Sequence, residues 1–129
     1  MGDFKKLEVW QLAHSLVCEV YRSTTEFPKT EAYGLTNQLR RSAASIAANI
    51  AEGCGRNGDA EFCRFVRISL GSATELEYHL LLSRDIGLLD DATHVRLAGK
   101  ATRVQGMLAG LRRALGYRTK NHCPTANSQ

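Results

Sequence analysis

The amino-acid sequence predicts an all-α protein, an antiparallel up-and-down four-helix bundle. Apolar residues recur every three or four positions in four segments, and no segment shows the sustained apolar/polar alternation of a half-buried strand. Glycine, proline or aspartate marks each junction, so the connections are short and successive helices are expected to be antiparallel neighbours. We expect one domain over residues 1–120 and a flexible C-terminal tail over residues 121–129.

The first two helices are predicted over residues 6–26 and 35–54. The first ends before Pro28, because the residue that precedes a proline is disfavoured in the α region. The second is rich in alanine, which lets its neighbours approach closely, and Gly53 and Gly55 are expected to supply a left-handed C-cap. The apolar stripes are Val9, Leu12, Ala13, Leu16, Val17 and Val20 in the first helix, and Leu39, Ala43, Ile46, Ala47 and Ile50 in the second.

The third and fourth helices are predicted over residues 58–86 and 91–115. Asp59 is expected to cap the third helix, and Asp90 or Asp91 the fourth. A glycine follows the end of each helix. The apolar stripes are Phe62, Phe65, Val66, Ser69, Leu70, Ala73, Leu76 and Leu80 in the third helix, and Val95, Ala98, Ala101, Val104, Leu108 and Leu111 in the fourth.

The basic residues are concentrated at the C-terminal end of the chain. Residues 1–91 contain 10 basic and 13 acidic side chains, whereas residues 92–129 contain 7 basic side chains and no acidic one. Basic side chains bind a nucleic-acid backbone by displacing its counterions, with little sequence specificity. A solvated helix face is the alternative interpretation. The candidate nucleic-acid-binding residues are Arg96, Lys100, Arg103, Arg112, Arg113, Arg118 and Lys120.

Polar side chains on the second and third predicted helices form a second group of candidates. A carboxylate near a bundle core needs a cation or a hydrogen-bond donor to offset its desolvation. Either Arg41 or Arg56 is suitably placed for Glu52. We interpret the group as a structural polar network, a buried ion pair or interface network, and not as a catalytic site. Its members are Arg41, Asn49, Glu52 and Glu75.

The fourth predicted helix also carries an unusual glycine face. Gly99, Gly106 and Gly110 share this face with Arg103, and each glycine costs about 1 kcal/mol relative to alanine in a helix interior. The glycines are either tolerated neutral substitutions or a smooth surface against which another helix packs, for example one from a neighbouring subunit.

Metal, cofactor and catalytic signals are weak. Residues 53–58 match G-x-G-x-x-G, but they follow a helix instead of the strand that a dinucleotide site requires, so we interpret them as a helix–helix turn. No Glu-x-x-His motif of a di-iron bundle is present. Two-ligand pairs, His14 with Cys18 and Glu75 with His79, arise often by chance. We therefore expect no metal, no cofactor and no enzymatic activity.

No apolar run is long enough to span a bilayer, and the N-terminus lacks the apolar region of a secretory signal. The four cysteines form no Cys-x-x-Cys pair and are expected to be reduced thiols. A cytoplasmic protein without a membrane partner is predicted.

Several stretches resemble a known family, the small four-helix-bundle proteins encoded in intervening sequences of bacterial large-subunit ribosomal RNA genes. The resemblance covers most of residues 4–89. The residues that carry it are Phe4-Lys5-Lys6-Leu7, Val9-Trp10-Gln11, Phe27-Pro28, Glu31, Tyr33-Gly34-Leu35, Gln38, Arg40-Arg41-Ser42-Ala43, Ser45-Ile46, Asn49-Ile50-Ala51-Glu52-Gly53, Arg56, Glu61-Phe62, Phe65, Gly71-Ser72 and Glu75-Leu76.

The resemblance implies a cytosolic four-helix bundle with no established enzymatic activity. Members of this fold, including the accessory variability protein of diversity-generating retroelements, assemble as homopentamers, and that relative binds nucleic acid. The sequence hypothesis is therefore a non-enzymatic homopentamer that binds RNA or DNA non-specifically through basic residues. The alternative is a protein–protein interaction scaffold that binds no nucleic acid.

Overall fold

The computed structural model describes residues 2–31 and 33–118. Within these ranges the chain forms four long α-helices and two short 3₁₀ turns, and no described residue lies in a strand. The elements are η1 (Phe4–Lys6), α1 (Glu8–Ser23), η2 (Lys29–Glu31), α2 (Leu35–Cys54), α3 (Asp59–Asp85) and α4 (Asp91–Arg118).

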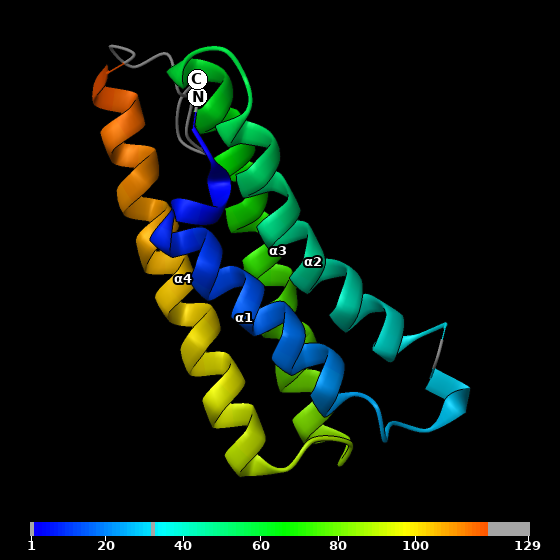
Figure 1. The fold of residues 1–129 in the computed structure, drawn as a ribbon. Helices are drawn as coiled ribbons and strands as arrows, with labels where there is room; N and C mark the ends of the chain where they lie inside the picture. The colour runs from blue at the N-terminus through cyan, green and yellow to red at the C-terminus, as the bar shows by residue number, and fades with distance from the viewer. Residues whose placement is uncertain (1, 32, 119–129) are drawn as a thin grey trace, which may run out of the picture.

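The four helices form an antiparallel bundle, which confirms the predicted fold class (Figure 1). α1 packs against α2 and α4, and α3 packs against the same two helices from the other side. The predicted tail over residues 121–129 lies outside the described residues.

The core runs along the bundle axis and receives side chains from all four helices. Its largest fully buried members are Leu16, Leu39, Ile46, Ile50, Leu76, Leu80, Leu97, Leu108, Leu115, Val20, Val66 and Val104. The predicted stripe of the fourth helix is wrong at Val95, which is 69 % exposed, while Leu97 is buried in its place. Leu97 falls in helical register with Ala101, Val104 and Leu108, whereas Val95 lies on nearly the opposite side of α4.

Two helix ends differ from the prediction. α1 ends at Ser23, before the predicted residue 26, and its C-cap is Thr24, whose hydroxyl donates to the Val20 carbonyl at 2.8 Å. α4 continues through Gly116 to Arg118, beyond the predicted end at residue 115. Leu115 is fully buried before the glycine, and Arg118 pairs with Asp59 after it.

The glycines near the end of α2 do not form the predicted left-handed cap. Gly53 is a buried residue inside α2, and Gly55 has a φ of −87°. The left-handed backbone occurs instead at Gly58, which has a φ of +90° and is the N-cap of α3 in place of the predicted Asp59. The prediction for α4 is confirmed, since the Asp90 carboxylate accepts the Thr93 N–H at 2.7 Å.

Candidate functional site

Two of the predicted nucleic-acid-binding cations are paired with one glutamate. Glu19 on α1 accepts a hydrogen bond from Arg96 Nε at 3.0 Å and forms an ion pair with Lys100 Nζ, which also donates to Ser15 Oγ at 2.9 Å. The side chains of Glu19 and Lys100 are only 16 % and 19 % exposed. The Lys100 hydrogen bond, with help from Arg96 and against the effect of burial, holds the pKa of Glu19 below its ordinary value of 4.5. These two cations therefore connect α4 to α1.

The remaining predicted cations of α4 fall into two groups. Arg118 Nε donates to Asp59 Oδ2 at 2.6 Å, so it joins the end of α4 to the start of α3. Arg103 and Arg113 are exposed and Arg112 is half-buried, and none of the three forms an ion pair with a described residue. Lys120 lies outside the described residues. The described candidate nucleic-acid-binding residues therefore fall into two groups, those that form an ion pair within the bundle and those that do not.

A further arginine without an ion-pair partner in the described chain, which was not among the candidates, lies on α3, the helix that packs against α4. Cys63 Sγ lies 3.8 Å from the Arg112 carbonyl oxygen, and Arg67 follows Cys63 by one helical turn on α3. Arg67 is half-buried and forms no ion pair within the described part of the chain, whereas Arg64 pairs with Glu61 at 3.3 Å. The spacing of Arg64 and Arg67 was visible in the sequence, but the register of α3 against α4 was not.

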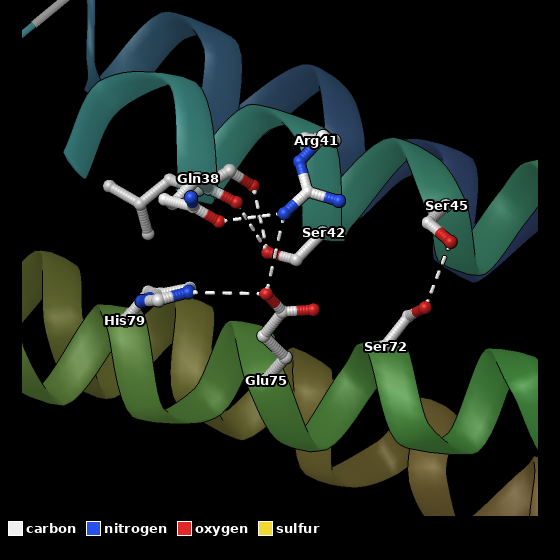
Figure 2. A network of polar contacts seen from close by, with 8 residues as sticks. Gln38, Arg41, Ser42, Ser45, Ser72, Glu75 and His79 are labelled. Atoms are coloured by element: carbon white, nitrogen blue, oxygen red, sulfur yellow. Dashed lines mark hydrogen bonds and ion pairs between the residues drawn. The ribbon is translucent and has the colours of Figure 1, made fainter. Parts of the chain in front are cut away.

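The α2–α3 interface contains a contact between Arg41 and Glu75, two members of the predicted polar network. Figure 2 shows Glu75 between Arg41, which lies across the interface, and His79, which lies one turn further along α3. Glu75 Oε2 is 3.7 Å from Arg41 Nη2 and 3.5 Å from His79 Nε2, and Arg41 also donates to Gln38 Oε1 at 2.8 Å. The Arg41 and Glu75 side chains are 60 % and 42 % exposed, so this contact lies at the edge of the interface.

A hydroxyl contact follows along the same interface. Ser45 Oγ and Ser72 Oγ are 2.8 Å apart, and Asn49 Nδ2 donates to Ser45 Oγ at 3.0 Å (Figure 2 shows the two serines). Deeper in the bundle, the Ser69 hydroxyl donates to the Ile46 carbonyl at 2.9 Å.

Glu52 belongs to neither contact. It pairs with Arg56 at 2.8 Å within a single turn. The structure brings Arg41 and Glu75 together, while Asn49 bonds Ser45 and Glu52 pairs with Arg56.

Comparison with known proteins identifies the family. The model of the 23S rRNA-intervening sequence protein family matches residues 5–110. The chain belongs to this family. The fold is also that of a crystal structure from Bacteroides thetaiotaomicron, a protein of unknown function from the S23 ribosomal protein family, with a TM-score of 0.74 and 21 % identity over 81 % of this chain and 98 % of that one. No curated protein matches the chain.

The structure of this intervening-sequence protein also shows the surroundings of the possible metal ligands, the glycine motif and the cysteines. His14 Nε2 lies 3.7 Å from Cys18 Sγ, and nowhere in residues 2–31 or 33–118 do three His, Cys, Asp or Glu side chains gather as they would around a metal ion. Residues 55–58 connect α2 to α3, while Gly53 and Cys54 are the last residues of α2, so the matched segment is the end of a helix and the turn that follows it. Cys18 and Cys54 are free, but Cys63 is disulfide-bonded, so the expectation of reduced thiols is wrong there.

Among the described residues, none of the helices combines the length and the apolar character that crossing a membrane requires.

Proposed function

We propose that the chain is a non-enzymatic homo-oligomer, a homopentamer, that binds RNA or DNA without sequence specificity. The observation that carries the nucleic-acid proposal is the set of α4 arginines without an ion-pair partner in the described chain, Arg103, Arg112 and Arg113. No acidic residue follows Asp91 in the sequence to neutralise them. Free guanidinium groups on a helix surface gain affinity for phosphates through counterion release. Arg67 adds a fourth such cation from α3.

Exposed apolar side chains support self-association. Tyr78, Leu81 and Val95 are exposed on α3 and α4, and the first two line a groove of about 310 Å³ between these helices. Apolar groups gathered on a surface are typical of a protein interface. The predicted glycine face is also open, since a Cβ at Gly99 or Gly106 would meet nothing within 4 Å.

A salt titration tests nucleic-acid binding. Binding of a fluorescent mixed-sequence DNA duplex is measured by anisotropy over a range of salt concentrations. The affinity is expected to fall steeply with salt, and R113Q is expected to reduce both the affinity and the slope of log K against log salt, by about 0.9 in slope if one phosphate contact is lost. The matched control is R84Q, since Arg84 already pairs with Asp85 at 3.0 Å. Salt-independent binding, or an R84Q effect as large as that of R113Q, contradicts the proposal.

Native mass spectrometry tests the assembly. The expected species is five times the 14.2 kDa mass of one chain, and V95E is expected to dissociate it without loss of helix content. Tyr33, which is almost fully exposed, provides the control substitution Y33E. A 14.2 kDa species alone at micromolar concentration would refute the pentamer.

The scaffold alternative draws on the same apolar groove. A second protein, instead of another copy of this chain, would then cover Tyr78 and Leu81. Recovery of an acidic protein partner by pull-down after nuclease treatment, lost in V95E, favours this alternative.

A further inference from the structure

A groove with a volume of about 640 Å³ lies between α1 and α2, on a part of the bundle that the proposed function does not use (Figure 1 shows the two helices side by side). The residues that line it are Tyr21 on α1 and Thr36, Asn37, Arg40, Arg41, Ala44, Ser45 and Ala48 on α2. Among the described residues that line the groove none is acidic, while two are arginines. Its lining therefore favours an anion.

Arg40 is held in a fixed orientation before any ligand arrives. Its Nε donates to Thr24 Oγ1 at 2.8 Å, its Nη2 donates to the Tyr21 carbonyl at 3.3 Å, and its guanidinium lies 4.7 Å from the centre of the Tyr21 ring. Arg40 forms no ion pair with the residues that the structure describes. An arginine side chain has five N–H donors, and the two hydrogen bonds to Thr24 and Tyr21 leave the others available to a ligand. A planar guanidinium can donate to two oxygens of one phosphate.

A second, independent feature of the groove is an unsatisfied hydroxyl. Thr36 lines the groove and is only 9 % exposed, and its Oγ1 is covered from solvent and has no hydrogen-bond partner among the described residues, so it reaches a ligand in the groove when the Thr36 side chain rotates. Buried hydroxyl groups are normally hydrogen-bonded, so an unpartnered one in the wall of a groove requires an explanation. Asn37, the next residue, is exposed and adds an amide donor to the same wall. Arg41 contributes a second guanidinium, partly offset by Glu75 at 3.7 Å.

We propose that this groove binds a phosphate group, with Arg40 as the principal contact and Thr36, Asn37 and Arg41 as additional donors. The phosphate is inorganic, the phosphate of a mononucleotide, or one phosphate of a nucleic-acid strand. The proposal does not rest on the α4 arginines, which belong to another helix.

The test is an NMR titration of the full chain with inorganic phosphate, following the Arg40 Nε–H signal. The wild type is expected to show saturable shifts centred on Arg40 and Thr36. R40K keeps the charge but loses the planar fork, and it is expected to bind phosphate at least tenfold more weakly. T36V retains the side-chain shape without the hydroxyl. It is expected to fold as well as the wild type and to bind several-fold more weakly, which keeps the test valid if R40K perturbs the end of α1.

Two further binding measurements identify the molecule that carries the phosphate. Displacement of inorganic phosphate by 5′-AMP, with no effect of a single-stranded oligonucleotide, indicates a mononucleotide. Loss of oligonucleotide affinity in R40K indicates a strand. R113Q is expected to leave the phosphate titration unchanged, so failure of nucleic-acid binding at α4 is distinguishable from failure of the groove. No shift at Arg40 on adding phosphate, or equal phosphate affinity in the wild type, R40K and T36V, would overturn the proposal.

Discussion

Glu19 of α1 binds Lys100 of α4 in an ion pair whose two side chains are both more than four-fifths buried. The residues are 81 positions apart in the sequence, and they join the first and last helices of the bundle. Arg96 shares the same carboxylate at 3.0 Å. The bundle therefore uses part of its C-terminal positive charge for its own stability.

Substitution of Glu19 is expected to destabilise the protein. E19Q removes the charge that two cations share and leaves the largely buried Lys100 without its charged partner, which is expected to cost about 1–3 kcal/mol of the free energy of unfolding. The measurement is chemical denaturation at one fixed protein concentration, because assembly contributes to stability. E26Q is the control, since Glu26 is exposed and makes no ion pair within the described chain. If E19Q and E26Q lower the free energy of unfolding equally, the Glu19–Lys100 ion pair contributes nothing to stability.

The same carboxylate predicts a pH dependence. The pKa of Glu19 is lowered in the folded state, chiefly by the Lys100 hydrogen bond, so its contribution is fully present above the unfolded value near 4.5. It is lost as the pH falls through the depressed folded-state pKa. The difference in unfolding free energy between wild type and E19Q is therefore expected to shrink as the pH falls below about 4.5 and through the lower folded-state pKa. A difference that stays constant over this range would contradict the assignment.

Gly53 is predicted to resist substitution even by alanine. A Cβ at this position would lie 2.7 Å from Phe65 Cβ and 2.9 Å from Phe62 Cδ1, so α2 and α3 would have to separate. G53A is expected to cost about 1–3 kcal/mol by overpacking, although alanine is the better helix former. G71A is the matched control on α3, where a Cβ meets nothing within 4 Å, and it is expected to be neutral or to stabilise by up to about 1 kcal/mol. Thermal unfolding of both variants decides the matter, and a stabilised G53A would disprove the close packing.

The α4 cations are predicted to separate by function. R96Q loses a hydrogen bond to Glu19 and is expected to lower stability while leaving the salt slope of nucleic-acid binding unchanged. R113Q, with no partner in the described chain, is expected to do the reverse. Denaturation and salt titration of the two variants, side by side, provide the comparison. Identical behaviour would mean that pairing within the fold does not determine which cations reach a ligand.

Ser69 offers a measure of the α2–α3 hydrogen bonding. S69A removes the donor to the Ile46 carbonyl in a fully buried position and is expected to cost about 1–2 kcal/mol. T74A, which removes an exposed hydroxyl that bonds only its own helix, is expected to change stability by less than about 0.5 kcal/mol. Urea denaturation of both variants tests this difference, and an S69A effect no larger than that of T74A would argue against it.

Local patterns were sufficient for the fold, as the case of α2 illustrates. Its predicted bounds, Leu35 and Cys54, are those observed, because a helix start and an apolar period are properties of neighbouring residues. The pairing of Glu19 with Lys100 and the contact of Cys63 with the Arg112 carbonyl depend on the register between helices, which no local pattern encodes. The prediction that Val95 is buried was wrong for a related reason. When a helix has apolar residues on several faces, its sequence alone does not show which face packs against the core.

The ion pairs of α4 also bear on how the chain assembles from its parts. Residues 1–91 are net negative and residues 92–129 net positive, and Glu19 and Asp59 of the first part hold Lys100 and Arg118 of the second. Cleavage of the backbone at the exposed turn around Gly87 would give two fragments of opposite net charge. Each fragment would keep its half of the ion pairs that join α4 to the other helices. Such fragments would attract one another over a distance, and added salt would slow their reunion.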